Sequence, residues 1–296
     1  MAIKEVKYDF FSIEIPESVL PPGKKLVDVL DLSLPNQIAR PIKYKDQYIR
    51  LESYRIDNFI RVGSATKITM EGLPSKVDIQ KPGLQGLGLK QSEGVASLTS
   101  FVIAPQYNAL ILQRNNQGVR AGSFVHLIET LTGLSDITLN LMLDQYVTQK
   151  LNRMQFISKF LVRISNPITP EAYRDTSAKE AARLSRHYNA SSVKIELSIG
   201  QGPRKLPLSI DAVKQSIRSL LRMNEAGEVA VESLVIRGKG FDDEKITPLD
   251  LIKERITCSI DVATRGREFP QEELERAAYA AFLAKENELK AYKPLE

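Results

Sequence analysis

Short segments in which apolar and polar residues alternate recur along the chain, and this feature most constrains its fold. Clear examples are residues 48–54, 95–103 and 109–114, and the last two are joined by a turn at Pro105-Gln-Tyr-Asn108. Alternation at period two, bounded by turn residues, predicts strands and hairpins. Residues 6–15 alternate too, but the frame changes at Phe10-Phe11, which indicates either a β-bulge or a strand buried on both faces.

Helical patterns lie between these strands. The predicted helices cover residues 122–131, 177–189 and 209–223, and a last one begins at Pro270. Further strands are predicted at 137–143, 156–164, 193–199, 229–238 and 255–263. Because strands and helices mix without a strict βαβ rhythm, we predict an α+β fold of two mixed sheet-and-helix domains with largely antiparallel strands, residues 1–134 and 135–296.

Composition narrows the class of protein. The 296 residues include one Cys, so no internal disulfide can form and a reducing compartment is expected. No apolar run approaches the roughly 20 residues that span a bilayer, and the charged N-terminal stretch does not resemble a signal peptide. We therefore expect a cytoplasmic globular protein.

Positive charge is concentrated in the middle of the chain. The net charge is +5 overall, but residues 140–222 hold 14 Lys and Arg against 6 Asp and Glu, a net of +8, whereas residues 223–296 hold 11 against 16, a net of −5. A basic segment inside a modestly basic chain is typical of phosphate binding.

Two predicted helices carry basic stripes. In residues 209–223, Lys214, Arg218 and Arg222 stand four apart, on a different face from the apolar residues. In residues 177–189 a similar stripe is expected beside a buried side formed by Ala181, Leu184 and Tyr188. Side chains four apart on a helix lie about 6 Å from one another, a spacing that suits successive phosphates.

The candidate nucleic-acid contacts all lie in this basic segment. They are Lys150, Arg153, Lys159, Arg163, Lys179, Arg183, Arg186, Arg204, Lys205, Lys214, Arg218 and Arg222. The alternative interpretation is an ordinary solvated face, but only three acidic residues interrupt residues 176–222. Such contacts predict backbone-led binding with little sequence specificity.

Residues typical of catalysis are sparse. His126 and His187 lack a Cys or His at ligand spacing, and Cys258 alternates with apolar residues as an inert core thiol would. The glycine-rich residues 83–88 match neither a Walker A loop nor a dinucleotide fingerprint. We therefore expect no catalytic residues, metal or cofactor.

A metal-dependent nuclease remains the least favoured alternative. Its acid-x-Lys triplet occurs at Glu5-Val-Lys7 and at Asp243-Glu-Lys245. The first has no acidic residue upstream, the second lies in a polar turn, and about three such triplets are expected by chance in a chain of this composition.

The segment from Ser100 to Val119 resembles the hairpin of a group of bacterial and prophage proteins, with Gln113, Arg114, Asn115, Gly118 and Val119 at the shared positions. The order of elements over residues 95–292 is similar to that of the RexA-like and KwaB-like phage-exclusion and defence proteins. This resemblance implies a DNA-binding homodimer that acts in antiphage defence without nuclease chemistry, with a membrane protein or another defence component as its partner.

Two main hypotheses follow. The first is a non-sequence-specific binder of double-stranded DNA that acts as a sensor or effector in phage exclusion. The second is a homo-oligomeric scaffold whose basic face docks an acidic protein partner. Steep salt dependence of DNA affinity would favour the first.

Overall fold

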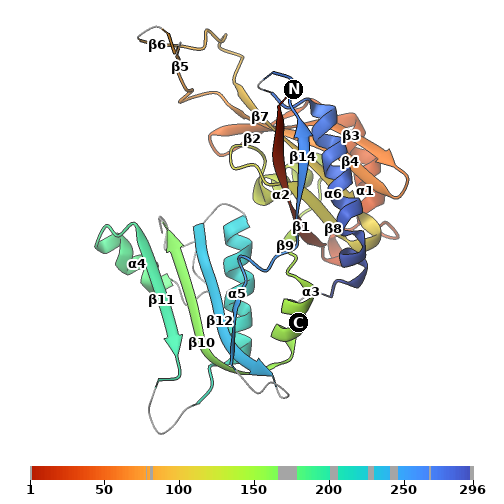
Figure 1. The fold of residues 1–296 in the computed structure, drawn as a ribbon. Helices are drawn as coiled ribbons and strands as arrows, with labels where there is room; N and C mark the ends of the chain where they lie inside the picture. The colour runs from red at the N-terminus through yellow and green to blue at the C-terminus, as the bar shows by residue number, and fades with distance from the viewer. Residues whose placement is uncertain are drawn as a thin grey trace. The chain divides into compact units, whose positions relative to one another are not determined.

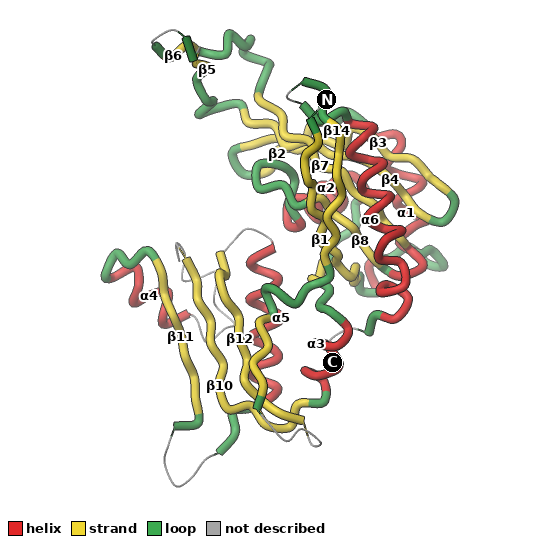
Figure 2. The backbone as a smooth tube through the Cα atoms, in the orientation of Figure 1, coloured by secondary structure: helices red, strands yellow, loops and turns green. Residues whose placement is uncertain are grey.

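The computed structural model (Figures 1 and 2) describes residues 2–77, 79–80, 83–165, 179–200, 206–225, 230–240, 246–266 and 268–293. It confirms the α+β class, because antiparallel sheets are combined with α-helices throughout the described chain. Of these helices, none is both long enough and apolar enough to cross a membrane.

The chain divides into two units. Unit 1 comprises residues 1–8, 13–138 and 258–284, and unit 2 comprises residues 9–12, 139–257 and 285–296. The change of unit near residue 138 lies close to the predicted boundary, but the C-terminal residues 258–284 belong to unit 1 rather than to the second domain. The cause is strand pairing, since the last strand of the chain joins the same sheet as the first.

Most of the larger sheet belongs to unit 1. Its strands, in spatial order, are β14 (Thr257–Ala263), β1 (Ile3–Glu14), β8 (Ala109–Gln113), β7 (Val95–Ala104), β4 (Ile60–Thr69), β3 (Gln47–Asp57) and β2 (Pro41–Tyr44), and β9 (Thr138–Leu141) also pairs with β1. A separate two-stranded ribbon joins β5 (Lys76–Val77) to β6 (Leu84–Gln85). The predicted hairpin is confirmed as β7 and β8, with Asn108 in the left-handed conformation at its turn.

Strand β1, the second strand in this order, continues through Phe10-Phe11 without a break. Its residues from Tyr8 to Ser12 are all buried, so the frame change at Phe10-Phe11 reflects burial on both faces. The two faces are covered by different helices, α2 (Ala121–Thr132) and α6 (Gln271–Ala291).

Neighbouring residues of β7 show how the two helices are arranged. Phe101 packs edge-to-face on Phe124 of α2, with ring centroids 4.9 Å apart. The next residue back, Ser100, bonds the hydroxyl of Tyr8 at 3.0 Å, and that hydroxyl also donates to the carbonyl of Leu274 in α6 at 3.1 Å. Because successive residues of a strand face opposite ways, α2 and α6 cover opposite faces of the sheet.

Several helix boundaries follow ordinary capping rules. Helix α2 ends where Gly133 adopts a φ of 75°, as its sequence predicts. Helix α1 (Leu26–Ser33) was not predicted, because its eight residues are too short for a clear helical period. It buries Val29 and Leu30.

Unit 2 contains a four-stranded antiparallel sheet. Its strands, in spatial order, are β11 (Ser192–Ser198), β10 (Met154–Ser165), β12 (Ala230–Gly240) and β13 (Thr247–Asp250). Its helices are α3 (Gln145–Asn152), α4 (Lys179–His187) and α5 (Ile210–Glu225). Helix α5 packs on β10 and β12, and α4 packs beside β11 (Figure 1).

Candidate nucleic-acid interface

Helix α5 is anchored to the sheet of unit 2 by one apolar face. Val213, Ile217 and Leu220 are buried and recur at helical spacing. They pack toward β10 and β12, whose inward residues include Phe160, with 1% of its surface exposed, and Leu234, with none. This packing fixes which side of the helix faces outward.

The basic stripe lies on another side of α5, as predicted. Arg218 and Arg222 are exposed and Lys214 is half-buried. Within the described part of the chain, neither Lys214 nor Arg222 forms an ion pair with a carboxylate. Lys214 and Arg222, eight residues and therefore about 12 Å apart along the helix, present an ammonium and a guanidinium group to an external anion.

The cations of β10 are arranged differently. Lys159 and Arg163 alternate with the buried Phe160 and Val162, so they point to the sheet face opposite α5. Each has a carboxylate partner: Lys159 contacts Glu196, and Nε of Arg163 lies 2.8 Å from a carboxylate oxygen of Glu232. The structure thus does not bring Lys159 and Arg163 together with the stripe on α5.

These ion pairs change the acidity of Glu196. A hydrogen bond from Lys159 lowers the pKa of the Glu196 carboxyl, and the charge of Lys194, whose Nζ lies 3.6 Å from it, lowers that pKa further. Glu196 consequently remains charged and offsets the positive charge of Lys159 and Lys194. It lies on the sheet face opposite α5, which we call the outer face.

Helix α3 positions two further candidates. The carboxylate of Asp144 caps this helix by accepting a hydrogen bond from the Tyr146 amide at 2.8 Å. Lys150 lies over the Tyr146 ring, 5.6 Å from its centroid, and Arg153 is exposed at the C-terminal end. Tyr146 is 66% exposed, so an aromatic ring accompanies a cation at this surface.

Helix α4 departs from prediction. Leu184 and Tyr188, expected on its buried side, are 59% and 74% exposed. The buried side is instead formed by the small residues Ala181, which is half-buried, and Ser185, which is buried. Among the predicted cations of this helix, Arg183 is exposed.

Other predicted cations are described only in part or not at all. For Lys179 and Arg186 only the backbone belongs to the described residues. Arg204 and Lys205 lie outside them, as do the first two residues of the predicted helix 177–189 and the triplet at residues 243–245.

One basic residue that sequence reasoning missed is Arg237 on β12. It stands opposite Lys159, which stands opposite Ser198 in turn. These three residues line a shallow pocket of about 600 Å³ on the outer face of the sheet, together with Ser158, Ile199, Gly200, Ile246 and Pro248. The alternation of Ser233, Val235 and Arg237 with buried Leu234 and Ile236 is the signal that could have found it.

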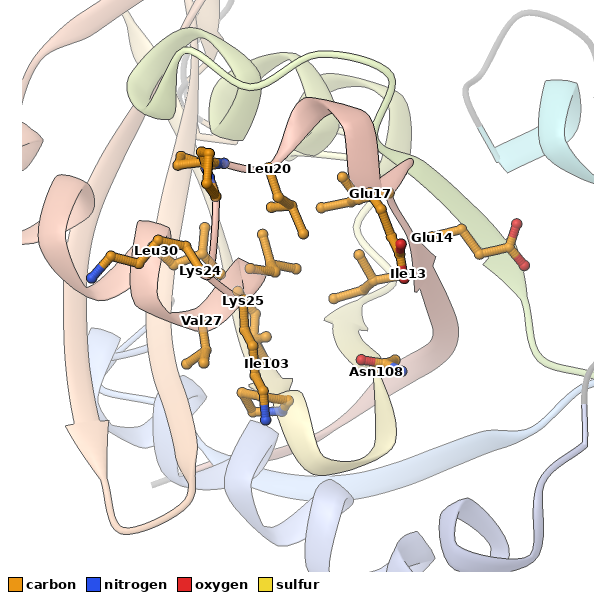
Figure 3. A pocket seen from close by; sticks show the side chains of 16 residues that line it. Ile13, Glu14, Glu17, Leu20, Lys24, Lys25, Val27, Leu30, Ile103 and Asn108 are labelled. Atoms are coloured by element: carbon orange, nitrogen blue, oxygen red, sulfur yellow. The ribbon is translucent and has the colours of Figure 1, made fainter.

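A second cavity belongs to unit 1 (Figure 3). It measures about 620 Å³ and has aliphatic walls that include Ile13, Leu20 and Ile103. Its charged lining residues are Glu14, Glu17, Lys24 and Lys25. No histidine, cysteine or serine is among the described residues that line it.

The two histidines that were considered as metal ligands pack against tyrosine rings. The His126 ring lies 5.2 Å from that of Tyr44, and His187 packs against Tyr188. Cys258 is half-buried rather than in the core, which is a correction to its expected place.

The triplet Glu5–Lys7 forms a loose ion pair at 3.9 Å with both side chains half exposed. Among the described residues, no three His, Cys, Asp or Glu side chains gather as metal ligands would.

Hydrogen bonds join the segment from Gln113 to Val119 to strand β7. The side-chain oxygen of Gln113, a buried residue, accepts from the Ser100 amide at 2.9 Å, and the Val119 amide donates to the Thr99 hydroxyl at 2.9 Å. A β-carbon on Gly118 would lie 2.1 Å from that same hydroxyl oxygen. The Gln-Arg-Asn-x-x-Gly-Val pattern therefore secures the turn after β8 to β7.

Comparison with known proteins identifies one family. No curated protein matches the chain. The model of a family of unknown function, DUF6731, matches residues 1–273, which include nearly all of unit 1 and most of unit 2. Since the match covers far more than half of the chain, the protein belongs to the DUF6731 family.

Proposed function

We propose that this protein binds double-stranded DNA without sequence specificity, through unit 2, as a sensor or effector component of bacterial antiphage defence in the cytoplasm. In this proposal it has no catalytic activity of its own. The observation that carries the binding proposal is the α5 stripe, in which Lys214, Arg218 and Arg222 recur on one side of a helix whose other side is buried.

The physical argument rests on pairing and spacing. A cation that already has a carboxylate partner gains less from a phosphate than one that has none, because the first pair must be broken. Lys214 and Arg222 have no described carboxylate partner, whereas Lys159 and Arg163 do. We therefore assign the phosphate contacts first to α5, with Lys150, Arg153 and Arg183 as additional candidates on α3 and α4.

The defence role depends on the resemblance in the order of elements to RexA-like and KwaB-like proteins. That resemblance also supports a homodimer and a membrane or other defence partner. An acidic protein docked on the α5 stripe is the competing proposal, since Lys and Arg side chains bind carboxylates as well as phosphates.

The test reverses the stripe. In a variant with Lys214→Glu, Arg218→Glu and Arg222→Glu, affinity for a short duplex should fall at least tenfold, because three favourable phosphate contacts become repulsive. The matched control reverses three exposed lysines of unit 1, Lys24, Lys43 and Lys76, which changes the net charge equally. Fluorescence anisotropy measures both, and thermal melting confirms that both variants fold.

Loss of affinity in the stripe variant alone would support the proposal. Equal affinities in the two variants would refute it. If wild-type protein binds no duplex at low salt but retains an acidic protein through this stripe, the scaffold proposal takes its place.

A further inference from the structure

Strand β11 is the end strand of the sheet in unit 2. Within the described part of the chain it pairs with β10 on one side and with no strand on the other. An unpaired edge offers a row of backbone donors and acceptors to another strand. Its neighbour α4 leaves two large apolar side chains, Leu184 and Tyr188, mostly exposed.

The hydrogen bonds to β10 determine which backbone groups face the free edge. The amide of Ile199 donates to the carbonyl of Ser158 at 3.1 Å. Backbone N–H and C=O groups of successive residues in a strand point to alternate sides. The backbone groups of Val193, Ile195 and Leu197 therefore also point toward β10. The amides and carbonyls of the even-numbered residues, Lys194 and Glu196 among them, therefore point outward.

The sequence of β11 is nearly symmetric about Ile195. It reads Ser-Val-Lys-Ile-Glu-Leu-Ser over residues 192–198. If a second copy of this strand aligned antiparallel about Ile195, Lys194 of each copy would stand opposite Glu196 of the other. Val193 would face Leu197, and the two terminal serines would face each other. Every pair across the symmetry axis would then be complementary in charge or polarity.

The outward backbone groups select the same register. In an antiparallel pair, residues that point toward each other exchange two hydrogen bonds, and here these would be Lys194 and Glu196 of opposite copies. Sliding one strand by two residues keeps the same backbone groups facing each other. In one direction this shift would place Lys194 opposite Lys194 of the other copy, and in the other direction Glu196 opposite Glu196. Like charges directly opposite destabilise a strand pair, so the symmetric register is the favoured one.

We propose that a second copy of this chain pairs with the free edge of β11, antiparallel and centred on Ile195, so that two four-stranded sheets become one continuous sheet in a two-fold symmetric dimer. Val193, Ile195 and Leu197 of both copies would share one face of this junction, where Leu197 is 40% exposed in the single chain. Lys194 and Glu196 would share the other face. This proposal uses a different surface from the α5 stripe and does not depend on DNA binding.

Charge reversal tests the pairing. Lys194→Glu alone and Glu196→Lys alone each place like charges at both symmetric positions, and each should raise the dimer dissociation constant by about tenfold or more. An equimolar mixture of the two variants restores every Lys–Glu pair and should give a one-to-one heterodimer. Analytical ultracentrifugation measures the first effect and native mass spectrometry the second, both without nucleic acid.

A control on the same sheet accompanies these variants. Lys239→Glu makes the same change of charge on β12, which is paired on both sides, and should leave the dimer intact. A disulfide tests the register: with Cys258 replaced by Ser, Ile195→Cys should oxidise to a covalent dimer, because α-carbons of directly opposite non-bonded residues lie about 4.5 Å apart. Leu197→Cys, which faces Val193, should not.

A wild-type protein that remains monomeric at every soluble concentration would overturn the proposal. So would a dimer that both charge reversals leave unchanged, or variants that fail to combine on mixing. Circular dichroism of each variant establishes that its fold persists, so that a loss of dimer reports on the edge itself.

Discussion

The salt dependence of DNA affinity gives the most direct measure of which cations contact phosphate. We predict that Arg222→Gln lowers affinity for duplex DNA and also reduces the steepness with which that affinity falls as salt rises. Arg222 is exposed on α5 and has no described carboxylate partner. The matched variant is Arg163→Gln, whose guanidinium is paired with Glu232 on the sheet face opposite α5.

The magnitude follows from the number of stripe cations. Each phosphate contact contributes about −0.9 to the slope of log affinity against log salt. The contacts of Lys214, Arg218 and Arg222 therefore contribute about −2.7, which is roughly a 40-fold loss of affinity between about 50 and 200 mM salt. Without Arg222 the slope falls to about −1.8 and the loss to roughly 12-fold.

Fluorescence anisotropy titrations at several salt concentrations provide the slopes. The Arg163→Gln variant should keep the wild-type slope, because its charge is already neutralised by Glu232. If the two variants change the slope equally, or if Arg163→Gln changes it more, the distinction between paired and unpaired cations fails. The stripe on α5 would then have no special role in binding.

Two predictions concern stability. Asp31 is partly buried, which opposes its ionisation, but hydrogen bonds from Arg61 and Tyr54 outweigh burial and lower its pKa. Its stabilising effect is therefore present above the unfolded-state pKa of about 3.9 and is lost as pH falls through the lower folded pKa. Asp31→Asn should cost about 2 kcal/mol at neutral pH and less in acid, and urea unfolding at several pH values would contradict this if the cost were independent of pH. Tyr8→Phe removes the bonds to Ser100 and the Leu274 carbonyl and should cost about 1–3 kcal/mol; a midpoint in urea equal to that of the wild type would show these bonds to be without net effect.

Local patterns predicted most of the elements because their periods were clear. The alternation in residues 95–114 predicts β7 and β8, and the period of Val213, Ile217 and Leu220 predicts both the buried side of α5 and its basic stripe. Helix α4 shows where such reasoning fails. Its large residues Leu184 and Tyr188 suggest a core face, yet the face toward β11 is formed by small residues, and helix propensity carries no information on which neighbour a face meets.

Long-range pairing was the part that local sequence patterns could not reveal. Nothing in the sequence of β10 states that its odd-numbered cations face away from α5, or that Lys159 meets Glu196 37 residues later in the chain. Period two predicts that Lys159 and Arg163 share a face with each other, but the face itself is determined by where α5 packs. The separation of the basic segment into distinct surfaces is therefore a property of the tertiary structure.

The pairing of β14 with β1 has a consequence for the order in which the protein can be made. Most of unit 2 is encoded between two parts of unit 1, so β1 leaves the ribosome long before its neighbour β14 exists. Until residues 258–284 emerge, Tyr8 lacks the Leu274 carbonyl to which it donates, and the α6 face of the large sheet is bare. Unit 2, by contrast, can complete its four-stranded sheet first. A gene fragment that stops at residue 134 would therefore encode an incomplete sheet rather than an independent domain.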